Sequence, residues 1–565
     1  MRIRLWLLSL SFLSLLAAQE PPLPLGVPSP APQPEIKPED QCTVAGIVLN
    51  SRTGQPVARA QVHLLRLDGG GPSSGAALTD PSGRFKLNGV APGQYRAVAS
   101  RNGFVRQVSQ SGRTPPQLTL APRQAVDGLT LELVPAAVIA GRVVDENGDP
   151  LPNVQLQPFR YVSVRGERHL VPFGAAVSTD DLGAYRMFGL NAGRYYISAF
   201  YSGKPGSTPG PGAPLMFGGP APEAAAEAYP PLFYPGVAEP SQAAPIQLRA
   251  GDERRGVDLR LAPVRTIRIR GHIAPFAGRM QEAFVTLAPR GDWGVATFSM
   301  GPRPPARVDA RGAFEFSGVT PGSHLLGAML NREGGTLWAR LPVEAGSADI
   351  DGLELAFRPN VDLKGRLRFD GGSQPGQDLT SVAVTLTPLQ GSMGFAGSSR
   401  SALDAAGSFQ IRNLAQGDYR LNIDPLPADA YILSAKYGEA DVTMKPVSLG
   451  EVPETLEVVL SAAGARVQGM VTEDGNPAPG ALVLVIPESG RADLRKVAQT
   501  DPNGRFTLRG LAPGGYTLYA CQGGSEGSVP DPQDLEGFQN KAQKITVQEQ
   551  GRVTADLTLI RTPDE

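Results

Sequence analysis

Residues 79–87 read TDPSGRFKL, and residues 91–95 continue as APGQY. The same order of residue types occurs five times: a Gly lies three residues after an Asp, an aromatic residue five after it, and a second Gly thirteen after it. The copies start at Asp80, Asp180, Asp309, Asp404 and Asp501. Because a fixed pattern at a long period is typical of tandem domains, the chain is expected to contain about five related units.

Each part of this pattern has a local structural reason. Asp-Pro-Ser-Gly predicts a type I turn, since the Asp carboxylate caps the turn, Pro presets φ and Gly accepts a positive φ. The alternation of Phe85 and Leu87 with charged residues is typical of a half-buried strand. Pro92-Gly93 fits the central positions of a type II turn, and another alternating strand starts at Tyr95. The pattern therefore predicts three strands joined by two turns, with one face buried.

Each unit also opens with a strand that has a central Gly and closes with an alternating strand. The opening glycines are Gly46, Gly141, Gly271, Gly365 and Gly469, which are 95, 130, 94 and 104 residues apart. About seven short strands in about 100 residues match the size of a β-sandwich. The predicted fold class is all-β, a tandem array of about five Ig-like β-sandwiches. The last unit is also expected to contain a short helix from Pro532, capped by Asp531.

The N-terminal part of the chain has a different character. Residues 1–18 combine a basic start, an apolar run and small residues, which predicts a cleavable signal peptide. Residues 19–41 are rich in Pro and predict a semi-rigid linker. No later segment approaches a membrane span, so the mature chain is expected to lack a transmembrane segment. The expected location is secreted, periplasmic or at the cell surface.

The opening strand with its Gly, the turn at residues 147–150 (NGDP), and the repeated Thr-Asp-x-x-Gly-x-Phe and Pro-Gly-x-Tyr patterns resemble the carboxypeptidase regulatory-like domain. The resemblance covers nearly all of the mature chain and is strongest in the first, second and fifth units. It implies a transthyretin-like β-sandwich, grouped with carbohydrate-binding-like sandwiches, that is an accessory rather than a catalytic part. The expected domains are residues 42–135, 136–263, 264–359, 360–462 and 463–565. The second carries a Gly- and Pro-rich insertion at about residues 202–247.

Composition limits the chemistry. With 53 Lys and Arg against 54 Asp and Glu, the net charge of −1 gives no global basic field for nucleic acid. The four His stand singly, without zinc-ligand spacing, and His324 occupies the place that holds Tyr in the other copies. Asp145, Asn147 and Asp149 are spaced like a calcium loop, but Pro150 replaces the required Gly, so a hairpin turn is predicted. Neither a metal site nor a cofactor is expected.

Two stretches fit the Gly-x-Ser-x-Gly pattern of a serine nucleophile, at residues 71–75 and 523–527. A nucleophile elbow needs a strand, a tight turn and a helix, with a His after the acid in the chain. No His follows His324, so both stretches are interpreted as loops and no catalytic residue is assigned. Cys42 and Cys521 would pair only if the first and last units touched, so two separate thiols are the favoured interpretation.

Aromatic side chains are the remaining candidates for ligand binding, because ring faces stack on the apolar faces of sugars. Trp293 and Trp338 lie in the third unit, and Tyr229, Phe233 and Tyr234 lie in the insertion of the second. Packing in a core or between domains is the competing explanation for all five.

The sequence predicts a non-catalytic secreted or envelope-associated binding or scaffold protein, with a glycan or an envelope protein as partner. The alternative is a purely structural spacer or an accessory component of an envelope assembly or transport system. A hydrolase is a remote alternative. Because turn geometry explains the repeated residues, functional information is expected where the copies differ, above all in the insertion.

Overall fold

The computed structural model describes residues 40–67, 74–105, 117–164, 167–201, 227–276, 282–290, 305–332, 335–371, 379–389, 399–521 and 532–560. The expected signal peptide at residues 1–18 lies outside them, as does the expected linker apart from residues 40 and 41.

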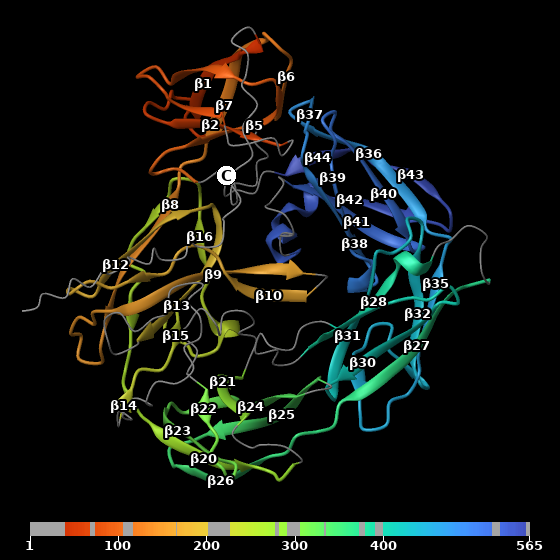
Figure 1. The fold of residues 1–565 in the computed structure, drawn as a ribbon. Helices are drawn as coiled ribbons and strands as arrows, with labels where there is room; N and C mark the ends of the chain where they lie inside the picture. The colour runs from red at the N-terminus through yellow and green to blue at the C-terminus, as the bar shows by residue number, and fades with distance from the viewer. Residues whose placement is uncertain are drawn as a thin grey trace, which may run out of the picture.

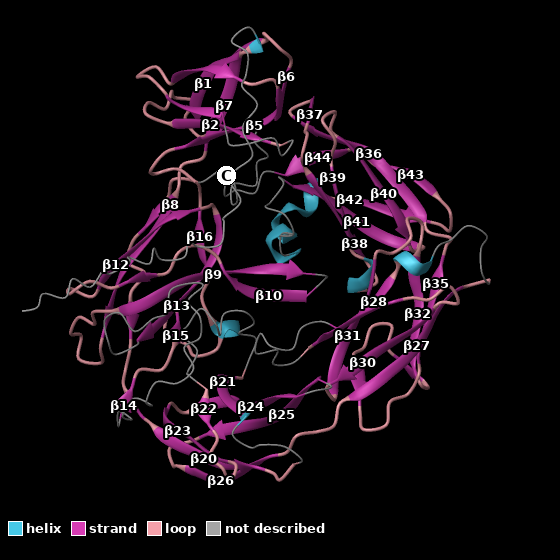
Figure 2. Cartoon of the chain, in the orientation of Figure 1, coloured by secondary structure: helices cyan, strands magenta, loops and turns pink. Residues whose placement is uncertain are grey.

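Strands dominate the described chain, and helix occurs there only as short 3-10 segments (Figure 2). The described residues form five large apolar cores, one after another along the sequence. The predicted all-β array of sandwiches is confirmed. We number the sandwiches 1 to 5 in chain order.

Sandwiches 1 and 2 each pair two sheets. The two sheets of sandwich 1 have the strand orders β4-β1-β7 and β3-β2-β5-β6. In sandwich 2, the first sheet has the order β12-β8-β17, and β18 also pairs with β8. The second sheet has the order β10-β9-β13-β15, with β11 paired to β9 and β16 paired to β13. The strands of sandwich 1 are β1 (Cys42–Asn50), β2 (Gln61–Arg66), β3 (Ser74–Leu78), β4 (Arg84–Val90), β5 (Gly93–Ser100), β6 (Gln117–Leu120) and β7 (Ala125–Leu133). The elements of sandwich 2 are β8 (Ala137–Val144), β9 (Val154–Val164), β10 (Glu167–Pro172), β11 (Val177–Ser178), β12 (Ala184–Leu190), β13 (Gly193–Tyr201), β15 (Leu232–Phe233), η2 (Pro240–Gln242), β16 (Ile246–Leu248), β17 (Glu253–Arg254) and β18 (Leu259–Arg260). A separate ribbon of β14 (Glu227–Ala228) and β19 (Val264–Arg265) leads toward the next sandwich.

Sandwiches 3 and 4 repeat this plan with fewer additions. Their sheets have the orders β23-β20-β26 and β22-β21-β24-β25, then β30-β27-β35-β32-β33 and β29-β28-β31-β34. The strands of sandwich 3 are β20 (Ile267–Ile273), β21 (Ala283–Pro289), β22 (Ala306–Arg307), β23 (Ala313–Val319), β24 (Gly322–Arg332), β25 (Gly335–Ala345) and β26 (Ile350–Leu355). The elements of sandwich 4 are β27 (Val361–Phe369), η4 (Leu379–Ser381), β28 (Ala383–Pro388), β29 (Ser399–Ala402), β30 (Ser408–Leu414), β31 (Gly417–Asp424), β32 (Tyr431–Tyr437), β33 (Ala440–Asp441), β34 (Val447–Leu449) and β35 (Leu456–Ser461).

In sandwich 5 the two layers merge into one sheet with the order β37-β36-β44-β41-β38-β39, because β44 pairs with both β36 and β41. The predicted short helix is present as the 3-10 helix η6, whose Leu535 is fully buried. Its predicted cap, Asp531, lies outside the described residues. The elements are β36 (Ala465–Glu473), β37 (Asn476–Pro477), β38 (Leu482–Pro487), η5 (Ala492–Leu494), β39 (Lys496–Gln499), β40 (Arg505–Leu511), β41 (Gly514–Cys521), η6 (Pro532–Lys541), β42 (Gln543–Val547), β43 (Arg552–Thr554) and β44 (Leu557–Ile560).

The central Gly of each opening strand permits a close approach to the closing segment of the same sandwich. A Cβ on Gly141 would collide with the carbonyl oxygen of Val257, and one on Gly469 with that of Ala555. Opening and closing strands run parallel here, as β8 and β18 show. The glycine recurs because two backbones meet at this point.

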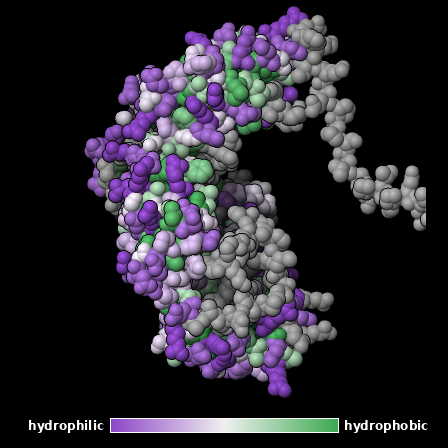
Figure 3. Space-filling model, turned by 90° about the vertical axis from the view of Figure 1, so that its left-hand side faces the viewer, coloured by the Kyte–Doolittle hydropathy of each residue, from purple (hydrophilic) through white to green (hydrophobic). Residues whose placement is uncertain are grey.

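The five sandwiches follow one another around an arc (Figure 1). The sheets that contain β9, β24 and β31 face the inner side of the arc, whereas those that contain β12, β20 and β27 face outward. In the merged sheet of sandwich 5, β41 lies on the inner side and β36 on the outer side. Seen from the side of β12, the described surface is mostly hydrophilic with scattered apolar residues (Figure 3). The arrangement is curved rather than a straight rod.

Candidate functional site

The five repeated aspartates all use their carboxylates in the same way. In each copy, Oδ1 accepts hydrogen bonds from the backbone N–H groups two and four residues later, at 2.7–3.0 Å. At Asp80, the N–H of Arg84 and then the hydroxyl of Ser82 lower the pKa of the carboxyl. These carboxylates hold the turn in place, as the sequence predicts. Because they are engaged in backbone hydrogen bonds, they are poorly suited to acid–base catalysis or metal binding.

The Thr before the Asp is a buried part of the same turn in three copies. The hydroxyl of Thr179 donates to Leu151 O (2.6 Å) and accepts from Val154 N (2.9 Å), which ties the turn to the neighbouring strand. Thr79 and Thr500 make the equivalent pairs of bonds. Sandwiches 3 and 4 have the apolar Val308 and Leu403 at this position.

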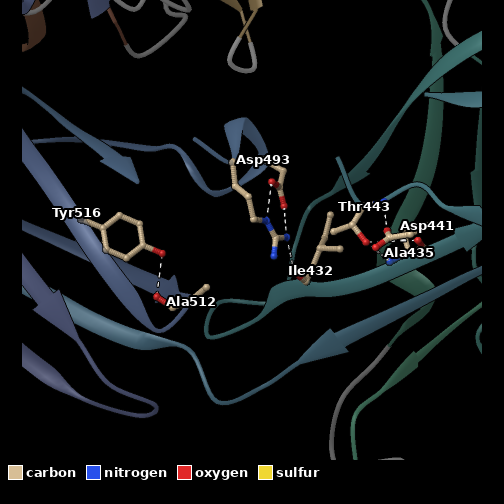
Figure 4. Close-up of polar contacts among 8 residues, drawn as sticks. Ile432, Ala435, Asp441, Thr443, Asp493, Ala512 and Tyr516 are labelled. Atoms are coloured by element: carbon tan, nitrogen blue, oxygen red, sulfur yellow. Dashed lines mark hydrogen bonds and ion pairs between the residues drawn. The ribbon is translucent and has the colours of Figure 1, made fainter. Parts of the chain in front are cut away.

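The residue two positions after the second Gly fixes the other turn. The hydroxyls of Tyr195, Tyr419 and Tyr516 each donate to the carbonyl four residues earlier, at 2.7–2.9 Å (Tyr516 is drawn in Figure 4). His324 places Nε2 2.9 Å from Thr320 O, so an N–H there makes the same bond. The interpretation of His324 as a structural substitute for Tyr is therefore supported by its geometry.

Other sequence motifs also have structural uses. Asp145 Oδ1 accepts from the N–H groups of Asn147 (2.9 Å) and Asp149 (2.8 Å), which makes the calcium-like stretch a hairpin turn. Within the described residues, no three His, Cys, Asp or Glu side chains are grouped to hold a metal ion. Residues 71–73 and 523–527 lie outside the described residues, and β3 rather than a helix follows the first of these stretches. Cys42 and Cys521 are both buried free thiols.

The aromatic residues of the insertion lie against sandwich 2. β15 adds to the edge of β13, with Ser198 opposite Phe233 and Ala199 opposite Leu232. Phe233 is fully buried on one face, with its ring 5.9 Å from that of Phe159. Phe233 therefore packs inside the sandwich, and its ring is not accessible to a ligand in this conformation.

Tyr229 and Tyr234 lie on the other face of the insertion and pack against the main core of sandwich 2, where both are half-buried. The ring of Tyr229 meets that of Tyr201 edge-on at 5.0 Å between centroids. Burial, followed by the charges of Glu146 and Asp145, raises the pKa of Tyr229. The three insertion aromatics thus share one segment but face two different environments.

Trp338 is separate from them, on β25 of sandwich 3. The strand register places it beside Met329, which lies beside Phe284, while the alternating residues Leu337 and Leu330 point into the core. Trp338 is half-buried and Phe284 is 36% exposed. Trp338, Met329 and Phe284 thus form a row across this face of the sheet, with an aromatic ring at each end. Trp293 lies outside the described residues.

A cleft of about 370 Å³ opens where the insertion meets the outer sheet of sandwich 2. Its walls are Arg142 and Val144 of β8, residues 258–260 at β18, and Pro235, which follows β15 through a cis peptide bond. Val144 pairs with Arg260, and Asp258 Oδ1 accepts a bond of 2.8 Å from the backbone N–H of Arg142. The cleft therefore combines two arginines, one aspartate and an apolar wall.

The polar side chains of Tyr185 and Asp258, next to this cleft, make hydrogen bonds that stabilise the fold. The hydroxyl of Tyr185 donates to Val257 O at 2.6 Å, and burial, then Asp258, then Tyr234 raise its pKa, so Tyr185 remains a neutral phenol. Among the described residues that line the cleft there is no His or Cys, and Asp258, the acid among them, already accepts a backbone bond. The arrangement is suited to binding a charged group rather than to acid–base or nucleophilic catalysis.

Sequence reasoning pointed to the insertion but missed Arg142 and Arg260. Arg142 follows the opening Gly, and Arg260 is one of the charged residues that alternate with Val257, Leu259 and Leu261 in the closing strand. These positions in the sequence indicate only that both arginines lie on the surface. Asp258 lies 116 residues after Arg142, and only the fold shows that Pro235 completes a cleft beside them.

The joint between sandwiches 4 and 5 is a second polar cluster. The Arg509 guanidinium makes two bonds to the Asp429 carboxylate, and Gly464 N donates to Asp429 O at 3.0 Å. Arg491 bonds both Asp493 and, across the joint, Ile432 O at 2.8 Å (Figure 4). The Arg509 hydrogen bond, the largest effect, lowers the pKa of Asp429.

This pattern of strands and turns has counterparts among known proteins. Two regions, residues 43–133 and 466–560, match the carboxypeptidase regulatory-like domain family. These regions correspond to sandwiches 1 and 5. The resemblance predicted for these units is confirmed. Both carry the buried Thr that sandwiches 3 and 4 lack.

No curated protein matches the chain. Solved structures with similar features include a streptococcal ancillary pilin (15% identity, 52% of this chain and 98% of that chain, TM-score 0.18). The minor pilin of Streptococcus agalactiae (13%, 42% and 98%, TM-score 0.21) and the major pilin subunit of Bacillus cereus (9%, 74% and 99%, TM-score 0.15) are others.

Proposed function

We propose that the chain is a non-catalytic scaffold and binding protein of the cell envelope or cell surface. Its five sandwiches would hold a ligand-binding surface in a fixed place on a curved frame. The observation that carries the proposal is the direct bonding between neighbouring sandwiches, above all Asp429 with Arg509 and Arg491 with Ile432 O.

Other joints are bonded in the same manner. Between sandwiches 1 and 2, Arg52 Nη1 donates to Ala250 O at 2.9 Å and Gly251 N to Pro135 O at 3.0 Å. Between sandwiches 3 and 4, Asn360 Nδ2 donates to Thr336 O at 2.9 Å. Such contacts favour a defined curvature over a flexible string of domains.

A location outside the cytoplasm is part of the proposal and rests on the signal-peptide pattern of residues 1–18. Among the described residues, no helix has the length and apolar character needed to cross a bilayer. The surface would act on a partner through binding, since the recurring acids and hydroxyls are engaged in turns.

Carbohydrate is the ligand class we propose. Trp338, Met329 and Phe284 supply a row of rings and apolar side chains on a sheet face. Tyr229 and Tyr234 are half-buried in the insertion, whose Pro235 lines the cleft of sandwich 2. A purely structural spacer is the competing function, and it requires no saturable ligand.

Small-angle X-ray scattering of the secreted chain tests the scaffold part of this proposal. We expect a distance distribution typical of an arc for the native chain and a longer maximum distance for Asp429→Ala combined with Arg491→Ala. Extended, flexible scattering that both proteins share would overturn it.

A further inference from the structure

We propose that the cleft of sandwich 2 binds the carboxylate of an acidic sugar, such as a uronate residue at the end or within a glycan chain. This inference rests on the proposed binding function and names its ligand more closely.

The first argument is the state of the two arginines. Within the described part of the chain, the guanidinium groups of Arg142 and Arg260 form no hydrogen bond and no ion pair, and both side chains are exposed. Many other arginines of the described chain are paired, for example Arg270 with Glu315 and Asp351. Two unpaired guanidinium groups beside one cleft attract a ligand that supplies the missing negative charge.

The second argument is charge within the cleft. Two arginines and Asp258 sum to +2 − 1 = +1 among the residues that line it. Oδ1 of Asp258 is held by the N–H of Arg142, so the aspartate has a structural task that explains its presence in a cationic cleft. Asp145 and Glu146 lie near Tyr229 and are not among the lining residues.

The third argument concerns size and shape. A volume of about 370 Å³ falls at the lower end of ordinary ligand pockets. Val144 and Pro235 form an apolar wall against which the C–H face of a sugar ring can lie while its carboxylate reaches the arginines, whereas the side chain of Leu259 points into the core. β18 is only two residues long, so an acidic peptide would find almost no strand edge to pair with.

Isothermal titration calorimetry of the secreted chain with trigalacturonate, at low ionic strength, tests the inference. We expect saturable binding that weakens as salt is added, and about tenfold weaker binding when Arg142→Ala and Arg260→Ala are combined. Arg186→Ala is the matched control: Arg186 is an exposed arginine on β12 of the same sheet but does not line the cleft. It should leave the affinity unchanged.

Asp258→Asn provides a variant that should gain affinity. Asn keeps an oxygen for the N–H of Arg142 and removes the negative charge, so trigalacturonate should bind more tightly. Circular dichroism and thermal unfolding of every variant show whether it is folded. Equal affinity of the native chain and the folded Arg142/Arg260 variant would overturn the inference.

Neutral and peptide probes separate the alternatives. A neutral galactose trimer that binds as tightly as trigalacturonate would refute a carboxylate site, and a glutamate peptide that binds more tightly would assign the cleft to a protein partner instead. Either result leaves the scaffold proposal intact, because scattering tests that proposal independently. Loss of the arc with retained trigalacturonate binding would refute the scaffold proposal and leave the carboxylate site in the cleft intact.

Discussion

Sandwiches 2 and 5 contain the same turn and differ in what is added to it. In both, a buried Thr, a capping Asp and a Tyr bonded to a carbonyl four residues earlier fix the turns. In sandwich 5, β41 pairs with β42 and η6 lies near it, with Leu535 beside Tyr519 and Cys521. In sandwich 2, β13 pairs with β15 of the insertion, and Pro235 then borders a cleft.

The Thr, Asp and Tyr that the two sandwiches share thus stabilise the fold. The segments added to each sandwich, the insertion in sandwich 2 and η6 in sandwich 5, make their surfaces different. Substitutions at shared positions should have matching effects in the two sandwiches, whereas substitutions at the cleft should affect ligand binding alone. The following predictions test this distinction, starting with the largest expected effect.

Replacing an opening glycine should destabilise either sandwich strongly. In Gly141→Ala and Gly469→Ala, the new Cβ meets a backbone carbonyl that cannot rotate away, so each change should lower the free energy of unfolding by about 3 kcal/mol or more. Urea unfolding with a probe in each sandwich measures the effect. Gly450→Ala, where a Cβ meets open space, is the control; near-native stability of Gly141→Ala would contradict the close-approach explanation.

Replacing the buried Thr should have a smaller but equal effect in the two sandwiches. Thr179→Val and Thr500→Val each leave a buried N–H and a buried carbonyl without the hydroxyl, which should cost about 1–3 kcal/mol of unfolding free energy. Denaturant titration gives the values. A loss confined to one sandwich would show that the turns are not equivalent.

The joint between sandwiches 4 and 5 should loosen in acid. Because the folded pKa of Asp429 lies below its ordinary value of 3.8, the contribution of its carboxylate is complete above about pH 4 and is lost as the pH falls through the folded pKa. Scattering at decreasing pH should show the arc opening only in that acidic range. Asp429→Asn should open it already at neutral pH, and a pH-independent profile in both proteins would refute the role of Asp429.

The tyrosine hydroxyls should contribute least. Tyr195→Phe and Tyr516→Phe should each cost about 1 kcal/mol of unfolding free energy at neutral pH. Burial raises the pKa of both phenols to about 12, so their contribution is present below pH 10 and is lost as the pH rises toward 12. The Phe variants should accordingly lose less stability than the native chain between pH 10 and 12 in thermal unfolding experiments.

The sequence predicted the parts of the structure that are decided locally. Asp180 and Gly183 specify their turn through residues within four positions, so the turn is readable from the chain alone. The cleft depends on the placement of Pro235 against strands far away in sequence, which no local pattern encodes. The arginines of the cleft could be recognised only after the structure showed that they have no partner among the described residues.

The most direct test of this division measures stability and trigalacturonate affinity in the same two variants. We predict that Thr179→Val lowers stability with unchanged affinity per folded molecule, and that the combined Arg142→Ala and Arg260→Ala variant lowers affinity with unchanged stability. If the Arg variant keeps its affinity, or if both variants lose affinity and stability in parallel, the separation of folding residues from binding residues in sandwich 2 is contradicted.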